Sequence, residues 1–282
     1  MWSPSDAEEG ARMLARHRQS LILEDIRRTG SARVSDLTQR LGVSDMTIRR
    51  DLEVLARSGL VEKVHGGAMT RARLSADEPG FEAKSHRQVA EKEAIARAAS
   101  DLVEPGQAVA LSAGTTTWRL ARRLRHTPNL TVITNSLPVA DVLHAEKRPD
   151  LTVALTGGVR TPSDALVGPI AAATLRSLHV DVLFMGVHGM SEDAGFTTPN
   201  LLEAETDEAL ITSAERLVVV ADHTKWGVRG LVSIAQLADA DVLISDGGLS
   251  PDARSILSES IGEVVIAPIH RRRPTASPTS SR

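Results

Sequence analysis

The fold of the N-terminal part is decided by the run Val43-Ser44-Asp45-Met46-Thr47-Ile48-Arg49-Arg50-Asp51-Leu52-Glu53-Val54-Leu55. Ser44 suits a helix N-cap, because its hydroxyl can accept a hydrogen bond from an N–H group of the first turn. Ile48, Leu52 and Leu55 recur at i, i+4 and i+7, so they share one face. The other side and its flanks hold Met46, Thr47, Arg49, Arg50 and Arg57. A short helix with one apolar and one basic face suits insertion into a DNA groove.

The residues on either side of this helix extend the pattern. A helix over about 13–28 is followed by a short one marked by Val34, Leu37 and Leu41, and Gly42 can supply the left-handed turn before the next helix. This predicts a helix-turn-helix; the alternative is a surface helix with solvated arginines. Residues 60–68 predict a β-wing, in which the side chains of Lys63 and His65 can reach phosphate and the backbone at Gly66 and Gly67 can approach a duplex. The alternative for the glycines is a plain hairpin turn.

These residues carry a resemblance to a known family. The pattern V-S-x-x-T-I-R-R-D-L over 43–52, followed by His65-Gly66-Gly67-Ala68, resembles the DNA-binding module of DeoR-type bacterial transcriptional regulators. The resemblance implies a winged helix-turn-helix that binds operator DNA, usually as a repressor. The residues predicted to contact DNA are Ser44, Met46, Thr47, Arg49, Arg50, Lys63, His65 and Gly66.

Charge and composition separate the chain into two parts. Its 282 residues have a net charge of −3, but residues 11–73 carry +6 and residues 74–282 carry −6. A basic module joined to an acidic one is expected when only one of them touches phosphate. There is no Tyr and few other aromatic residues, so double-stranded DNA is favoured over single strands. The absence of Cys, of a signal-peptide pattern and of a long apolar run predicts a cytoplasmic protein.

The rest of the chain predicts a Rossmann-like α/β domain with a mostly parallel sheet. Apolar runs alternate with helical stretches, which is typical of strands covered by helices on both faces. We predict strands over 109–111, 131–134, 152–155, 181–187, 217–221, 241–245 and 263–267, and helices over 86–103, 116–125, 136–146, 168–178, 202–214 and 251–260. The predicted organisation is a disordered leader (1–12), the winged helix-turn-helix (13–70), a linker (71–85), the effector-sensing and oligomerisation domain (86–268) and a disordered tail (269–282).

Polar residues follow five of these strands, at the sheet edge where ligands of parallel sheets bind. The hydroxyl-rich start of the helix at 115 suits phosphate, and Asp222 and Lys225 place opposite charges on the same edge. The candidate effector-binding residues are Ser112, Gly114, Thr115, Thr116, Thr117, Asn135, Ser136, Gly157, Gly158, His188, Asp222 and Lys225. They favour a small, phosphorylated, polyhydroxylated ligand. No nucleotide-binding motif and no metal-ligand cluster occurs, so we expect no cofactor and no metal.

This half also resembles the sensor domain of DeoR-type regulators, which is similar to ribose-5-phosphate isomerase. The landmarks are Gly114-Thr115-Thr116, Thr134-Asn135-Ser136, Gly157-Gly158, the stretch 181–186, Gly195 and Asp222-His223-Thr224-Lys225. The resemblance implies a response to sugar phosphates or related intermediates. Many members have an acidic residue where this chain has Ser112, so one sugar hydroxyl is expected to be bound differently.

Catalysis is the main alternative function. An aldose–ketose isomerase needs a carboxylate base and a group that stabilises the enediolate. Where the similar isomerases have a D-G-A-D segment, this chain has Met185-Gly186-Val187-His188, without either acid. We therefore predict a ligand-controlled repressor of a sugar or carbohydrate catabolic operon that acts as a homodimer or homotetramer. His188 as a general base, a metal-dependent hydrolase and a scaffold without ligand are the less favoured alternatives.

Overall fold

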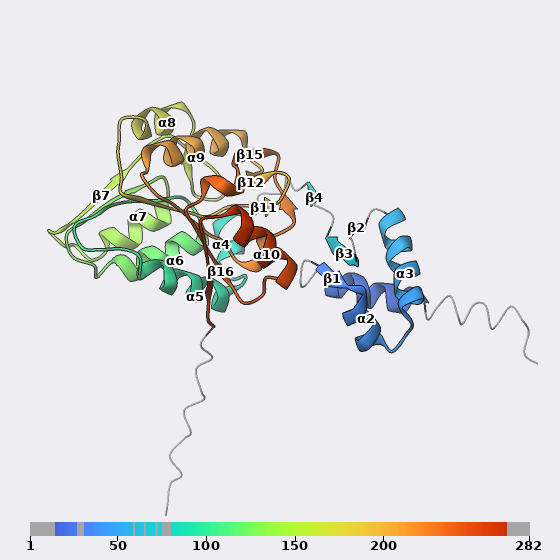
Figure 1. Cartoon of the computed structure of the whole chain (residues 1–282). Coiled ribbons are helices and arrows are strands. Elements are labelled where there is room, and N and C mark those ends of the chain that lie inside the picture. Colours follow the sequence, from blue (N-terminus) through green and yellow to red (C-terminus); the bar gives the residue numbers. More distant parts are fainter. Residues whose placement is uncertain are drawn as a thin grey trace, which may run out of the picture.

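The structure is a computed structural model, and it describes residues 15–26, 31–58, 60–64, 66–70, 73–74 and 80–269. A small N-terminal domain of helices and short strands is followed by a larger domain built on a seven-stranded sheet (Figure 1). The predicted leader at 1–12, His65 and most of the predicted tail lie outside the described residues. Within the part that is described, no helix is long and apolar enough to cross a membrane.

The N-terminal domain packs three helices around a compact apolar core. These are a helix over 15–26, α2 (Val34–Leu41) and α3 (Asp45–Arg57). Ile48, Leu52 and Leu55 of α3 are all buried, which confirms the apolar face that their spacing predicts. Gly42 ends α2 in the left-handed conformation, with a φ of 64°. The predicted turn between the two helices is therefore confirmed.

The wing is a three-stranded antiparallel sheet. The predicted hairpin forms from β2 (Val61–Val64) and β3 (Gly67–Thr70), and β1 (Ser31–Arg33), which the sequence analysis did not predict, pairs with β3. A Cβ atom at Gly67 would lie 2.4 Å from the carbonyl oxygen of Ala32. The missing side chain at Gly67 therefore serves the close contact between β1 and β3, and its approach to DNA stays a prediction.

The larger domain is a doubly wound parallel sheet. Its strands overlap all seven predicted segments: β5 (Ala108–Leu111), β6 (Leu130–Thr134), β7 (Leu151–Leu155), β10 (Val182–Met185), β13 (Leu217–Val220), β16 (Val242–Asp246) and β17 (Glu263–Ala267). Their spatial order is β17-β16-β13-β10-β5-β6-β7, and each neighbouring pair is parallel. The direction of winding reverses between β5 and β10. A crevice forms at such a switch point, beyond the carboxyl ends of the strands.

Helices cover both faces of this sheet (Figure 1). One face carries α5 (Val89–Ser100), α6 (Thr115–Leu124) and α7 (Leu137–His144); the other carries α8 (Pro169–Leu175), α9 (Leu201–Ser213) and α10 (Pro251–Ser260). Side chains alternate between the two cores along each strand, so Val109 and Leu111 pack on the first face and Ala110 packs on the second. Beside the second face lies an antiparallel sheet of β11 (Gly189–Ser191), β12 (Gly195–Thr198) and β15 (Val232–Ala235), which was not predicted.

The predicted linker is not wholly a linker. Its last residues form the short helix α4 (Phe81–Ser85), and the ring of Phe81 meets the ring of Trp118 edge-on at 5.9 Å. Upstream, β4 (Arg73–Leu74) pairs with β14 (Val228–Arg229) of the larger domain. Pro79 and Gly80 suggested a flexible connection, and a single aromatic residue gives no periodicity, so the packing of α4 could not be seen in the sequence.

Candidate functional site

The outer face of α3 presents the side chains predicted to contact DNA. Ser44 caps the helix, because its hydroxyl accepts the N–H of Thr47 at 3.3 Å. Its hydroxyl also lies 2.9 Å from the hydroxyl of Thr47. Met46 is 77% exposed and Arg50 is exposed. Arg49 is exposed too, but its guanidinium binds the Asp45 carboxylate one turn earlier, with Nε 2.7 Å from Oδ1.

The wing adds a second exposed surface beside α3. Lys63 is exposed on β2, and Gly66 is exposed in the turn with a φ of 81°. The carbonyl of Gly66 accepts the N–H of Val34 at 2.9 Å, which fixes the turn against the start of α2. His65 lies outside the described residues, so its predicted role stays a prediction. The other seven predicted residues are all on α3, its N-cap or the wing.

A cavity of about 290 Å³ lies at the switch point of the larger sheet. It is bordered by the residues that follow β5, β10 and β13, and by α4, α5 and α9. Of the twelve candidate effector-binding residues, seven line it: Gly114, Thr115, Thr116, Asn135, His188, Asp222 and Lys225. Parallel strands thus bring together groups from four separate strand ends, those of β5, β6, β10 and β13, that lie more than a hundred residues apart in the sequence.

The start of α6 gives the cavity an anion-binding wall. Gly114 is the N-cap, and Thr115 and Thr116 form the first turn with their side chains almost fully buried. The first N–H groups of a helix have no partner within the helix, and they attract negative charge. Asn135 borders the same wall, and its Oδ1 accepts the N–H of Ala113 at 2.8 Å.

Five candidate residues do not border the cavity, and in three of them the hydroxyl group makes hydrogen bonds that serve the fold. The hydroxyl of Ser112 accepts the N–H of Gly186 at 3.0 Å, which ties β5 to β10. Thr117 donates to the carbonyl of Gly114 at 3.0 Å, and Ser136 caps α7 by accepting the N–H of Val139.

The two glycines are placed by packing. A Cβ atom at Gly158 would lie 2.5 Å from the carbonyl oxygen of Val167, and the φ of 120° also disfavours other residues. Gly157 has a φ of 71°, in the left-handed region that favours glycine. Both glycines therefore fit the hairpin of β8 (Val159–Arg160) and β9 (Leu166–Val167) rather than an anion site.

Three further cations line the cavity that the sequence analysis did not identify. Lys84 belongs to α4, within the predicted linker, and Arg87 follows α4, within the predicted sensor domain. Lys92 lies on the buried face of α5, is 5% exposed, and donates from Nζ to the carbonyl of Lys84 at 2.8 Å. Burial lowers the pKa of Lys92 to about 8, against the raising effect of the Asp222 carboxylate. Its spacing from Ile95 and Ala96 places it on the apolar face of the helix, which is the pattern that could have revealed it.

The cavity also has an acidic wall. Glu203 and Asp207 lie one turn apart on α9, and both line the cavity. Glu203 accepts the hydroxyl of Ser163 at 2.7 Å and that of Thr198 at 3.0 Å. Burial raises the pKa of Asp207 well above its usual range, and the neighbouring Glu203 and Glu208 add to the rise. The arrangement can hold an anionic group among the cations while carboxyl groups face hydroxyls elsewhere on the same molecule.

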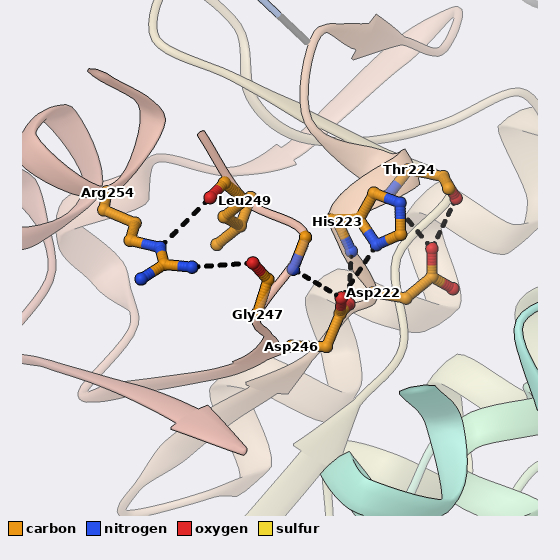
Figure 2. A network of polar contacts seen from close by, with 8 residues as sticks. Asp222, His223, Thr224, Asp246, Gly247, Leu249 and Arg254 are labelled. Atoms are coloured by element: carbon orange, nitrogen blue, oxygen red, sulfur yellow. Dashed lines mark hydrogen bonds and ion pairs between the residues drawn. The ribbon is translucent and has the colours of Figure 1, made fainter. Parts of the chain in front are cut away.

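Asp222 and Lys225 close the cavity on the side of β13. They belong to a short 3-10 turn, His223–Lys225, which Asp222 caps by accepting the N–H of Thr224 at 3.1 Å. Burial lowers the pKa of Lys225, and the Asp222 carboxylate opposes that change. His223 points the other way, toward Asp246, and does not border the cavity (Figure 2).

Comparisons with known proteins agree with this division of the chain. The protein-family model described as DeoR-like helix-turn-helix domain matches residues 18–73, and the family model described as DeoR C terminal sensor domain matches residues 87–247. The regulator GlpR of Haloferax volcanii is 36% identical over 92% of this chain and 100% of its own length. The lactose phosphotransferase system repressor of Staphylococcus aureus is 34% identical over 80% of this chain and 89% of its own.

The chain also has a distant likeness to a solved structure, ribose 5-phosphate isomerase A from Methanocaldococcus jannaschii. The TM-score is 0.35 and the identity 19%, over 48% of this chain and 53% of that one. The family assignment rests on the two domain models and the sequence relatives instead. With a helix-turn-helix domain and a sensor domain that both match, this chain belongs to the DeoR family of transcriptional regulators.

Proposed function

We propose that this protein represses a sugar or carbohydrate catabolic operon in the cytoplasm, and that a phosphorylated sugar bound in the cavity controls its binding to operator DNA. One observation carries the effector class: the N-terminus of α6, the ammonium groups of Lys92 and Lys225, and the carboxyl groups of α9 line one cavity. Phosphate suits the first group of residues, and sugar hydroxyls suit the second. The relative from Staphylococcus aureus, named for a lactose phosphotransferase system, supports the link to sugars.

Operator binding is proposed to use the exposed face of α3 and the wing. Arg50 and Thr47 would read base edges, while Arg49 and Lys63 would engage phosphates. A single winged module gives limited affinity, so we propose a homodimer or homotetramer whose paired modules match two half-sites. The effector would change the arrangement of those modules.

Thermal unfolding of the full chain tests the effector class. We expect one or two of glucose 6-phosphate, fructose 1-phosphate, ribose 5-phosphate and glycerol 3-phosphate to raise the unfolding temperature, since a ligand at 100 times its Kd stabilises by about 2.7 kcal/mol. The unphosphorylated sugars should have no effect, and Lys92→Met should reduce the shift. No shift with any of the four phosphates, or equal shifts with the free sugars, would contradict the proposal.

A further inference from the structure

The loop that borders the cavity is fastened to the end of a neighbouring strand by one buried carboxylate. Asp246, at the end of β16, is 1% exposed. It accepts the backbone N–H and the Nδ1 of His223, each at 2.8 Å, and the N–H of Gly248, also at 2.8 Å (Figure 2). The imidazole packs so closely that a Cβ atom at Gly248 would lie 2.4 Å from its ring. Asp246 therefore joins the loop after β13 to the loop after β16 with little freedom between them.

On the cavity side, this loop carries two groups that face a bound molecule. Asp222 and Lys225 flank His223 and line the cavity. A ligand that moves either of them must also move His223, because the three residues belong to one tight turn. Two hydrogen bonds join His223 in turn to Asp246.

On the other side, the loop after β16 is fastened to α10. Arg254 of α10 donates from Nη2 to the carbonyl of Gly247 at 2.7 Å and from Nε to the carbonyl of Leu249 at 3.1 Å (Figure 2). Asp252, in the first turn of the same helix, forms an ion pair with Arg33 of the N-terminal domain. The contacts thus continue from the cavity to the surface of the DNA-binding domain.

Arg33 contacts the larger domain and lies next to the wing, which is part of the proposed DNA-binding surface. It ends β1, and the next residue, Val34, binds the carbonyl of Gly66 in the wing turn. A groove of about 650 Å³ lies between the domains. The N-terminal domain lines it with Asp45, Arg49 and Gly66, and the larger domain lines it with Asp252 and Trp226. Asp252 holds a cation next to the wing that could otherwise meet a DNA phosphate.

We propose that the occupancy of the cavity reaches the DNA-binding domain through His223, Asp246 and α10, and that the ion pair between Arg33 and Asp252 is made or broken in response. This inference rests on the proposed function, because it assigns the route by which that effector acts. The pair is exposed, with side-chain exposures of 59% and 37%. Exposed ion pairs are weak, so a modest difference in ligand affinity between the two arrangements suffices to switch it.

Hydrogen exchange of the full chain without ligand tests the route. Asp252→Asn should speed exchange of the amides at 31–36 by about two- to fivefold, the range expected for a lost exposed ion pair. Asp246→Asn should speed exchange at 223–225, at 247–254 and also at 31–36.

Two variants serve as controls and should leave 31–36 unchanged. Asp241→Asn removes a carboxylate at the other end of β16 that accepts the N–H of Leu217, and Glu205→Gln breaks an exposed ion pair with Arg176. If Asp246→Asn loosens 247–254 but leaves 31–36 as in the wild type, the route is wrong.

A second measurement uses whichever of the four phosphates stabilises the wild type most. That compound should change the affinity of the wild type for operator DNA by about tenfold. It should change the operator affinity of Asp252→Asn by less than about twofold, although the Kd of the variant for the compound equals that of the wild type. The double variant Arg33→Asp/Asp252→Arg should restore slow exchange at 31–36. A full response in Asp252→Asn would overturn the inference while leaving the proposed function intact. If none of the four compounds binds, the proposed function fails, and the exchange result still decides the route.

Discussion

Arg50 on α3 and Lys92 on α5 both supply positive charge to a binding surface, but their surroundings are opposite. Arg50 is exposed to solvent, whereas Lys92 is 5% exposed and burial lowers its pKa to about 8. Exposed cations attract a polyanion from a distance, and salt screens them. A buried cation is costly until an anion reaches it, so it responds to the charge of a small ligand and to pH. The two regions therefore suit a long polymer and a small metabolite, respectively.

Salt concentration should separate the two regions most strongly. An oligomer that makes about six to ten phosphate contacts should lose about 10³- to 10⁵-fold in operator affinity between 50 and 200 mM salt, because counterions are released on binding. Binding of a sugar phosphate in the cavity should change by less than about tenfold over the same range. Fluorescence anisotropy measures the affinity for operator DNA, and calorimetry measures the affinity for the sugar phosphate. An equal salt dependence of the two would contradict the difference between the two binding surfaces.

Removing one exposed cation should affect DNA alone. Arg50→Ala should weaken specific binding to the gene's own upstream region by about 10- to 100-fold, because a side chain that reads a base edge is lost. Arg122→Ala removes the same charge from α6, where the guanidinium lies 5.1 Å from the ring centre of Trp118. In gel-shift assays that control should bind as the wild type does. Undiminished binding by Arg50→Ala would refute the assignment of α3 as the recognition helix.

The buried cation should make effector binding depend on pH. A bound phosphate raises the pKa of Lys92, so binding takes up a proton wherever Lys92 is neutral in the free protein. Because the pKa of Lys92 in the ligand-free protein is about 8, the affinity for the sugar phosphate should fall by about tenfold from pH 7 to pH 9. The phosphate itself is fully charged over that range. Calorimetric titrations should show this fall in the wild type and in Lys63→Met, and a shallower fall in Lys92→Met, in which Lys225 remains.

The smallest effects concern two adjacent threonines. Thr116 lines the cavity, whereas Thr117 is fully buried and donates to the carbonyl of Gly114. Thr116→Val should weaken effector binding by about two- to tenfold through a lost hydrogen bond, with little change in unfolding temperature. Thr117→Val should lower the unfolding temperature and leave the Kd within about twofold. The reverse result would show that the cavity wall is assigned to the wrong residue.

Local patterns were enough to predict the DNA-binding domain and the sheet. Ser44, Gly42 and the spacing of Ile48, Leu52 and Leu55 each depend on neighbours a few residues away, and the structure places all of them as predicted. The seven parallel strands followed from continuous apolar runs, and the runs in the inner strands are buried on both faces. β1 was missed because a three-residue polar strand has no periodicity to detect.

The cavity could be predicted only in part, because it depends on packing between distant segments. Strand ends of a parallel sheet meet at one edge, which is why residues such as Thr116 and Asp222 were found. The roles of Thr117 and Ser136 could not be separated from theirs, since a hydroxyl that caps a helix and one that faces a ligand have the same sequence context. Glu203 and Asp207 were missed because tertiary packing decides which side of α9 faces the cavity.

The position of α4 also sets where this sensor can be cut and transplanted. Phe81 and Lys84 line the cavity, so a chimera that joins a foreign DNA-binding module at residue 86 would remove part of the sensor's wall. A junction before Gly80 keeps that wall but gives up the pairing of β4 with β14. The most conservative design would exchange the module upstream of Arg73 and carry the whole intervening segment along with the sensor.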